Sequence, residues 1–331
     1  MTTELDLKQS ENLSINEKVE KILRFSKFNK SKSTQKTHFY SLWDFAKFRA
    51  KVKKIELSED RNLEITRMMT DYCNQSALDA KLILADYLIS LEERKQSSST
   101  IATKLAAIKD HISFQKGITH FPLWDLDFIK SPKVENKKVP GPSEAEFALL
   151  LNHIQKLEKS LSYIDRRDAL MVYLLSFCAL RVSEVLSINI EEIDWAKSTI
   201  LVSRKGKRLK QEFSLGPKIL NRIQKFVLEN KKYNGPLFIN QDKVNKTFTG
   251  LTRGSAYRIV RKIGDMVGID NFHPHKLRHF GATEAIEAAD GNRHEAMKFT
   301  SHLSESQMTR YEDERENTQL KISQKIEDKW L

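Results

Sequence analysis

The chain has 331 residues, and its 56 Lys and Arg against 44 Asp and Glu give a net charge of +12, which predicts attraction to a polyanion: nucleic acid first, an anionic membrane surface second. Its two cysteines exclude a disulfide scaffold and a zinc site built on paired cysteines, and they fit a reducing, cytoplasmic compartment. No apolar run reaches the about 20 residues of a membrane-spanning helix, and the polar, acid-containing first residues are unlike a signal peptide.

The first part of the chain predicts a helical domain. Residues 1–30 are polar and then weakly amphipathic, so we expect an N-terminal arm that ends in a short helix. Apolar residues at three- and four-residue spacing predict helices at residues 34–51, 77–91 and 99–115, the last with a Ser/Thr run as its N-cap. We expect these helices to form one domain over residues 31–130.

A basic segment opens this domain. Residues 21–54 hold eleven Lys and Arg and a single acid, Asp44, with aromatic residues between the cations. This combination is typical of a helix that contacts phosphates on one side and packs against a core on the other. The candidate DNA contacts are Lys30, Lys32 and Lys36. The alternative is an ordinary solvated helix face.

Residues 131–142, SPKVENKKVPGP, form the clearest linker, because prolines, a glycine and lysines dominate them. A second domain follows at residues 143–315, and residues 316–331 form a C-terminal tail. In this domain, residues 198–215 carry the only clear strand signal, two alternating runs that flank Lys205, Gly206 and Lys207 as a hairpin, and the remainder is helical in pattern. The prediction is a mainly α protein with one small antiparallel β-sheet.

Several polar residues of the second domain could carry chemistry. Arg181 lies in the apolar run FCALRVSEVL, where a buried guanidinium needs an anionic partner, and Glu184 is three residues away on the same helical face. This pair could also be purely structural. His275 and Arg278 are three residues apart, so a helix would project both side chains from one face toward a phosphate. Tyr311 could act as a nucleophile only beside groups that take its proton.

A metal site is a weaker possibility. The cluster of His273, His275 and His279 has no cysteines to match and no acid at ligand spacing, so we do not expect a metal there.

Taken together, these residues resemble the tyrosine recombinase family, the phage integrase and Xer-like enzymes. The resemblance is carried by Arg181 in ALRVSEVLSI, Lys205 in SRKGKR, the HKLRH of residues 275–279, and His302 with Tyr311 nine residues later. Their identity, order and spacing all agree.

The resemblance covers residues 141 to about 315 and extends upstream. SKSTQKTHFYSLWDFAKF and SSSTIATKLAAIKDHISFQKG are similar to the first and last helices of the family's core-binding domain. The resemblance therefore implies a two-domain tyrosine recombinase architecture, a helical, SAM-like core-binding domain followed by a mixed α/β catalytic domain. It implies a site-specific DNA recombinase.

The resemblance also implies a catalytic set of two arginines, a lysine, two histidines and a tyrosine: Arg181, Lys205, His275, Arg278, His302 and Tyr311. The arginines would hold the nonbridging oxygens of the scissile phosphate, and the lysine would protonate the departing 5′ hydroxyl. His275 would help to remove the tyrosine proton, His302 would donate to a phosphate oxygen, and Tyr311 would attack to give a 3′-phosphotyrosine. No metal or nucleotide cofactor is implied, since the arginines and the lysine supply positive charge.

The partner implied is a double-stranded DNA recombination site, bound by a homo-oligomer that is a tetramer on paired sites. The tail at residues 316–331 would pass between subunits. Candidate DNA contacts of the second domain are basic residues of the hairpin and of a following helix: Lys207, Arg253, Arg258, Arg261 and Lys262. Two alternatives are a monomeric enzyme that nicks and closes DNA, like a type IB topoisomerase, and a noncatalytic DNA-binding relative.

The sequence departs from the family pattern in three places. Ala179 and Ser301 stand where the family usually has glycine, and both are small enough to keep the backbone path. Residues 58–75 lengthen the first domain between its first two recognised helices, so the register of the helices there is open.

Overall fold

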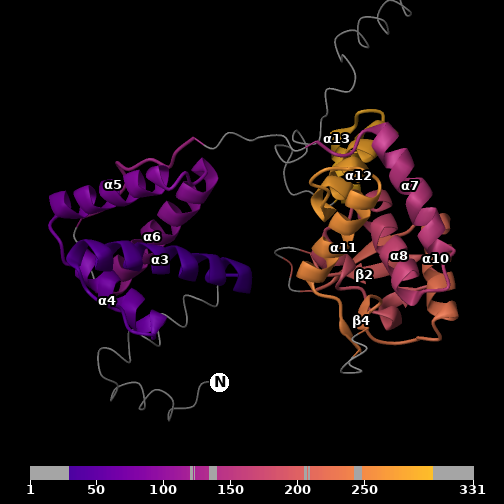
Figure 1. The fold of residues 1–331 in the computed structure, drawn as a ribbon, viewed down its shortest axis with the longest axis horizontal. Coiled ribbons are helices and arrows are strands. Elements are labelled where there is room, and N and C mark those ends of the chain that lie inside the picture. Colours follow the sequence, from indigo (N-terminus) through magenta and orange to yellow (C-terminus); the bar gives the residue numbers. More distant parts are fainter. Residues whose placement is uncertain are drawn as a thin grey trace, which may run out of the picture. The chain divides into compact units, whose positions relative to one another are not determined.

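The chain folds into two compact units, Met1–Glu135 and Asn136–Leu331, in the computed structural model (Figure 1). The structure describes residues 30–119, 122, 124–133, 140–204, 207, 209–241 and 248–300. The arm predicted before residue 30, residues 134–139 of the linker, and the tail at residues 316–331 lie outside the described residues. Each unit is described by itself.

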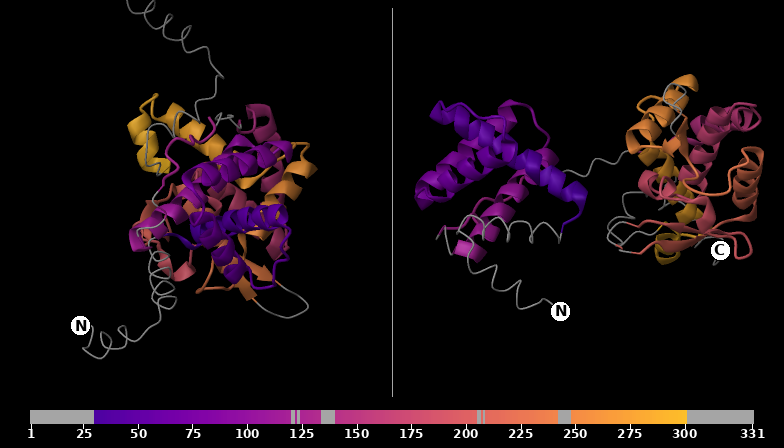
Figure 2. Two further views of the ribbon diagram at one scale, coloured as in Figure 1. Left: turned by 90° about the vertical axis from the view of Figure 1, so that its left-hand side faces the viewer. Right: turned by 90° about the horizontal axis from the view of Figure 1, so that it is seen from below.

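Unit 1 is made of helices in its described part: α3 (Lys32–Lys53), α4 (Arg61–Cys73), α5 (Ala77–Glu93) and α6 (Ser98–Thr119). The three helices predicted from apolar spacing are α3, α5 and α6, and the lengthened segment at residues 58–75 forms α4. Side chains cap the helix starts as helix formation requires: the Ser31 hydroxyl accepts from the Thr34 N–H at 3.1 Å, and the Asp60 carboxylate accepts from the Leu63 N–H at 3.1 Å. Figure 2 shows these helices crossing one another.

The core of unit 1 centres on an aromatic cluster. The ring of Phe45 in α3 meets the ring of Tyr72 in α4 and that of Tyr87 in α5 edge to face, each at 5.0 Å between centroids. The Tyr87 hydroxyl donates to Asp44 at 2.8 Å, and Asp44 also pairs with Arg94 and Lys104. The single acid of the basic segment therefore stabilises the core side of α3.

Unit 2 is built around one central helix, α8 (Tyr163–Phe177), whose second half is largely buried. An uninterrupted run of eight residues from Ala169 to Ser176 is buried, because four other helices pack on α8 from different sides (Figure 1). These are α7 (Glu144–Glu158), α10 (Pro217–Glu229), α11 (Arg253–Met266) and α12 (Pro274–Ala288). Two shorter helices, α9 (Val182–Val185) and α13 (Arg293–Thr300), and the 3-10 turn η1 (Ile190–Glu192) complete the helical part among the described residues.

Two antiparallel sheets are present in the described part of unit 2, one more than the sequence predicted. The first has the order β1 (Ile193–Asp194), β2 (Thr199–Val202) and β3 (Gln211–Ser214). Its register places Ile200 opposite Phe213, and both side chains face the core. The second pairs β4 (Ile239–Gln241) with β5 (Phe248–Gly250). Strands of three residues are too short for an alternating pattern, which is why the sequence did not reveal this sheet.

The expected fold class, mainly helical with small antiparallel sheet structure, is thereby confirmed. Within the described residues, no helix is both long and apolar enough to cross a membrane. Both cysteines are buried free thiols, and burial raises the pKa of Cys73 to about 11 and that of Cys178 to about 12.

Candidate active site

The structure describes three of the six predicted catalytic residues, Arg181, His275 and Arg278, and all three are in unit 2. Lys205, His302 and Tyr311 lie outside the described residues, as does Ser301.

Arg181 stands immediately before α9 and forms the pair that its spacing predicted. The Glu184 carboxylate accepts the Arg181 backbone N–H at 2.8 Å and the Arg181 Nη1 at 2.9 Å. The Glu184 side chain is 1% exposed, whereas that of Arg181 is 28% exposed. A buried carboxylate thus holds one edge of a guanidinium that remains accessible to an anion from solvent.

Arg278 reaches the same carboxylate from α12. Its Nη1 donates to the carbonyl of Ala179 and lies 3.8 Å from Glu184 Oε2, and its Nη2 donates to the carbonyl of Thr300 at 2.8 Å. The Arg278 side chain is 2% exposed. One buried carboxylate therefore lies between two guanidiniums, which leaves a net positive charge at this point of unit 2. Such a charge favours binding of an anion.

Close packing of α12 on the end of α8 brings Arg278 to this position. Gly281 lies one turn after Arg278, and a Cβ atom there would overlap the Ser176 carbonyl oxygen and lie 3.1 Å from the Ala179 Cβ. Ala179 itself adopts φ 47°, the left-handed conformation that glycine favours. The expectation that Ala179 keeps the glycine-like backbone path is met by this conformation, and its carbonyl accepts from Arg278.

His275 is the second residue of α12 and stays accessible to solvent. Partial desolvation, together with nearby positive charge, that of Arg278 first, lowers the pKa of His275 to about 4. The imidazole is therefore neutral at pH 7 and able to accept a proton. His273 lies beside it, with the two rings nearly parallel and 6.5 Å apart. No group of three or more His, Cys, Asp or Glu side chains in the described part of the chain is placed to hold a metal ion.

The root of the β2–β3 hairpin is hydrogen-bonded to Ser187, which lies two residues after the end of α9. The Ser203 backbone N–H donates to the Ser187 hydroxyl at 2.9 Å, and this hydroxyl donates to the Glu184 carbonyl at 2.7 Å. From the other strand, Lys210 Nζ donates to the Ser187 carbonyl at 2.7 Å and pairs with Glu192. Both ends of the hairpin are thus tied to the segment that carries Arg181 and Glu184.

Sequence reasoning missed Ser187, Lys210 and Arg204 at this site. Ser187 and Lys210 match no motif, because their partners are distant in the chain. Arg204 adjoins the Lys205, Gly206 and Lys207 of the predicted hairpin, and that position was the one available signal.

The predicted DNA-contacting cations divide into two kinds. Lys30 is neutralised by an ion pair with Asp110. The others are exposed and form no ion pair with a described residue: Lys32, Lys36, Lys207, Arg253, Arg258, Arg261 and Lys262. On α3, Lys32 and Lys36 share a face with Lys47 and Lys51, which are also exposed. Charge on this face is available to a polyanion.

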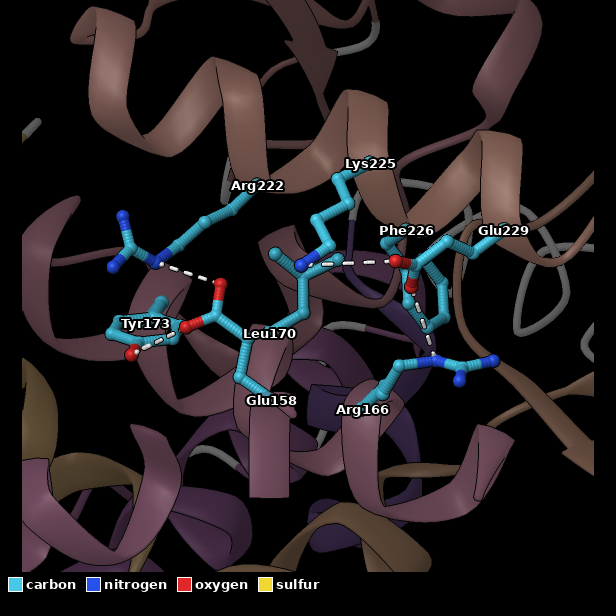
Figure 3. A pocket seen from close by; sticks show the side chains of 8 residues that line it. All are labelled: Glu158, Arg166, Leu170, Tyr173, Arg222, Lys225, Phe226 and Glu229. Atoms are coloured by element: carbon cyan, nitrogen blue, oxygen red, sulfur yellow. Dashed lines mark hydrogen bonds and ion pairs between the residues drawn. The ribbon is translucent and has the colours of Figure 1, made fainter. Parts of the chain in front are cut away.

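A hollow between α7, α8 and α10 is a different feature of unit 2 (Figure 3). Its charged side chains neutralise one another, since Arg222 Nε is 3.1 Å from Glu158 and Arg166 Nε is 3.4 Å from Glu229. None of the predicted catalytic or DNA-contacting residues lines it. The candidate active site is therefore the Arg181, Glu184 and Arg278 cluster and not this hollow.

Comparison with known proteins matches residues 144–318 to the phage integrase family. The chain is 28% identical over 248 residues to a tyrosine recombinase of Synechocystis sp., which covers 73% of this chain and 77% of that protein. Its fold is similar to that of the XerH site-specific recombinase bound to a palindromic difH substrate, with a TM-score of 0.60 and 18% identity, over 88% of this chain and 97% of that one. It is also similar to the Tn1549 transposon integrase in complex with circular intermediate DNA, with a TM-score of 0.52 and 17% identity, over 85% and 98% of the two chains.

Proposed function

This chain belongs to the phage integrase family and is a tyrosine recombinase, a DNA breaking and rejoining enzyme, and we propose that it cleaves and rejoins duplex DNA at specific sites through a 3′-phosphotyrosine. The proposed catalytic set is the one expected from the sequence: Arg181, Lys205, His275, Arg278, His302 and Tyr311.

The observation that carries this proposal is the convergence of Arg181 and Arg278 on Glu184. Among the described residues, two guanidiniums share one buried carboxylate, and these three groups carry a net positive charge. A phosphodiester has one negative charge and two nonbridging oxygens, so it complements this arrangement. In the proposed complex, the guanidiniums of Arg181 and Arg278 donate to those oxygens.

The proposed reaction balances without a further reagent. The Tyr311 oxygen forms a bond to phosphorus while the bond from phosphorus to the 5′ oxygen breaks. The tyrosine proton passes to His275, whose low pKa keeps it neutral beforehand, and Lys205 gives a proton to the leaving 5′ oxygen. His302 donates to a phosphate oxygen. Attack on the phosphotyrosine by a 5′ hydroxyl of another strand then reverses these steps and joins new partners.

Binding of the double-stranded site is proposed to involve both units. Support comes from the exposed lysines of α3 in unit 1 and from the exposed cations of α11 in unit 2. Neutralising phosphates with Lys and Arg releases counterions, so affinity should fall steeply with salt. We further propose a homo-oligomer, a tetramer on paired sites, in which residues 316–331 dock on a neighbouring subunit.

The decisive experiment uses Tyr311→Phe and a nicked suicide substrate, which traps the covalent adduct. The wild type should form an adduct that persists on a denaturing gel, whereas Tyr311→Phe should bind the same DNA and form none. Tyr233→Phe is the matched control, because Tyr233 is 62% exposed and should cleave like the wild type. An adduct in Tyr311→Phe would assign the nucleophile to another residue.

A second assay separates recombination from the alternatives. Strand exchange between two sites, with relaxation of supercoiled DNA measured on the same preparation, should show exchange that depends on paired sites. Relaxation without exchange would favour the monomeric, topoisomerase-like enzyme, and neither activity would favour a noncatalytic DNA-binding protein. Truncation after Gln319 should abolish exchange and spare binding to one half-site if the tail acts between subunits.

A further inference from the structure

Arg204 is a partly buried cation that the proposed mechanism does not use. It lies two residues after the end of β2, and its guanidinium carbon lies 5.6 Å from the centroid of the Phe213 ring in β3. Its Nη1 is buried and finds no hydrogen-bond acceptor among the described residues. A buried guanidinium donor without an acceptor is costly, because it has lost water and gained nothing in exchange. An anion at this point would remove that cost.

Two chains of contacts place Arg204 beside the candidate active site. On one side, the N–H of its neighbour Ser203 donates to the Ser187 hydroxyl, which donates to the Glu184 carbonyl. On the other side, the Phe213 ring beneath it meets the Phe299 ring at 5.6 Å. Phe299 precedes Thr300, whose carbonyl accepts from Arg278. The hairpin therefore holds Arg204 between the two elements that fix Arg181 and Arg278.

The guanidinium of Arg204 interacts electrostatically with Glu184 and Arg181 of the candidate active site. Desolvation lowers the pKa of its guanidinium, the negative charge of Glu184 acts in the opposite direction, and the positive charge of Arg181 lowers it further. Arg204 thus adds to the positive charge around Glu184, and it forms no ion pair of its own with a described residue.

We propose that Arg204 is a third phosphate-binding arginine, which donates to the scissile phosphodiester of the bound DNA. The inference rests on the proposed function, since it assigns a further residue to the same site. Its cation–π contact with the Phe213 ring holds the guanidinium in place, and we propose that this contact positions Nη1 for a phosphate oxygen. Arg204 contributes most when negative charge on the phosphate is greatest, in the transition state.

The test compares Arg204→Gln, Arg204→Lys and the wild type at saturating suicide substrate. Loss of one preorganised donor to a transition-state oxyanion typically lowers a rate by about 100-fold, and this loss of adduct formation is expected for Arg204→Gln. Arg204→Lys keeps the positive charge but loses the planar guanidinium with its several donors, so it should react faster than Arg204→Gln and more slowly than the wild type. Lys197→Gln is the control, because Lys197 lies at the turn before β2, is 70% exposed, and pairs only with Asp194 among the described residues. It should react like the wild type.

A methylphosphonate at the scissile position then identifies the role. This substitution removes the negative charge that Arg204 is proposed to meet. The about 100-fold deficit of Arg204→Gln should therefore shrink to a few-fold on the methylphosphonate substrate. An equal deficit on both substrates, or none on either, would overturn the proposal. Thermal melting of each variant is the check on folding, and loss of a cooperative transition in both Arg204 variants would make the residue structural and overturn it too.

The two proposals fail in different ways. If Tyr311→Phe still forms an adduct, the proposed nucleophile is wrong whatever Arg204 does. If adduct formation depends on Tyr311 and Arg204→Gln reacts at the wild-type rate, the Arg204 assignment alone is wrong.

Discussion

Glu184 Oε1 accepts a hydrogen bond from Arg181 Nη1 at 2.9 Å, three residues away on the chain. The other oxygen of the same carboxylate lies 3.8 Å from Nη1 of Arg278. Both side chains of the second pair are almost completely buried. A single acidic side chain thus lies against both proposed phosphate-binding groups, and it need not touch DNA.

Replacing Glu184 with glutamine should destabilise the protein and slow cleavage. Glu184→Gln leaves the buried Arg278 without its negative neighbour, and removal of one partner of a buried ion pair typically costs about 3 kcal/mol or more of unfolding free energy. Urea denaturation measures this change. The control is Glu212→Gln, an exposed position in β3 that should change stability by less than about 0.5 kcal/mol. Equal stability of the two variants would mean that Glu184 does not stabilise the arginines.

Ala179→Gly should stabilise the folded chain or leave it unchanged. The φ of 47° at Ala179 is unfavourable for a residue with a Cβ by about 1 kcal/mol, and glycine removes that penalty. Glycine also adds freedom to the unfolded chain, worth about 0.4 to 1 kcal/mol, so the net gain is small. Ala179→Val, a β-branched residue in the same conformation, should lower the melting temperature clearly. A lower melting temperature for the glycine variant would contradict this interpretation.

Gly281→Ala should lower stability and adduct formation together. Its added methyl group would overlap the Ser176 carbonyl, and overpacking of this kind costs about 1 to 3 kcal/mol. The shift of α12 would also move Arg278 relative to Ala179. Gly254→Ala in α11 is the matched helical control, because a Cβ there meets nothing closer than 4.0 Å. Melting temperatures and single-turnover rates check both variants. Wild-type values for Gly281→Ala would show that the contact between α12 and α8 can accept a methyl group without cost.

Substrates whose leaving group does or does not need a proton test whether Lys205 is the general acid and whether the hairpin root positions it. Lys205→Ala should slow cleavage of an ordinary substrate by about 10² to 10⁴, and much less when the 5′ bridging oxygen is sulfur, because a thiolate leaves without a proton. Ser187→Ala removes the hydroxyl that joins Ser203 to Glu184, so it should show the same pattern with a smaller effect. Equal losses on both substrates would make Lys205 a binding residue, and Lys207 would become the candidate acid.

The pKa of His275 should lie far below that of an ordinary histidine. Its folded pKa of about 4 means that the unfolded chain takes up the proton first, near pH 6.5. Stability should therefore fall as pH drops from about 6.5 to about 4, and His275→Gln should remove this part of the slope. NMR titration of the imidazole in the DNA-free protein measures the pKa directly. A midpoint near 6.5 would contradict the lowering of the pKa by partial desolvation and nearby positive charge.

Local sequence determined the features whose causes lie within about four residues. The Ser31 hydroxyl caps α3 by accepting from Thr34 three residues later, and the continuous apolar residues of α8 suit a helix that is packed on several sides. The Arg181 and Glu184 pair was predictable for the same reason, because one helical turn brings positions i and i+3 together. The order of the basic and nucleophilic residues along the chain also indicated the family.

Tertiary structure decided the contacts that join distant segments. Arg278 donates to the carbonyl of Ala179, 99 residues earlier, only because Gly281 lets α12 lie against the end of α8. The Ser187 hydroxyl acquires its role because the root of the β2–β3 hairpin lies against the segment after α9. The Phe213 ring acquires its role because β3 pairs with β2. A sequence pattern records the period of an element and its caps, whereas the partner of a buried polar group is fixed by which elements pack together.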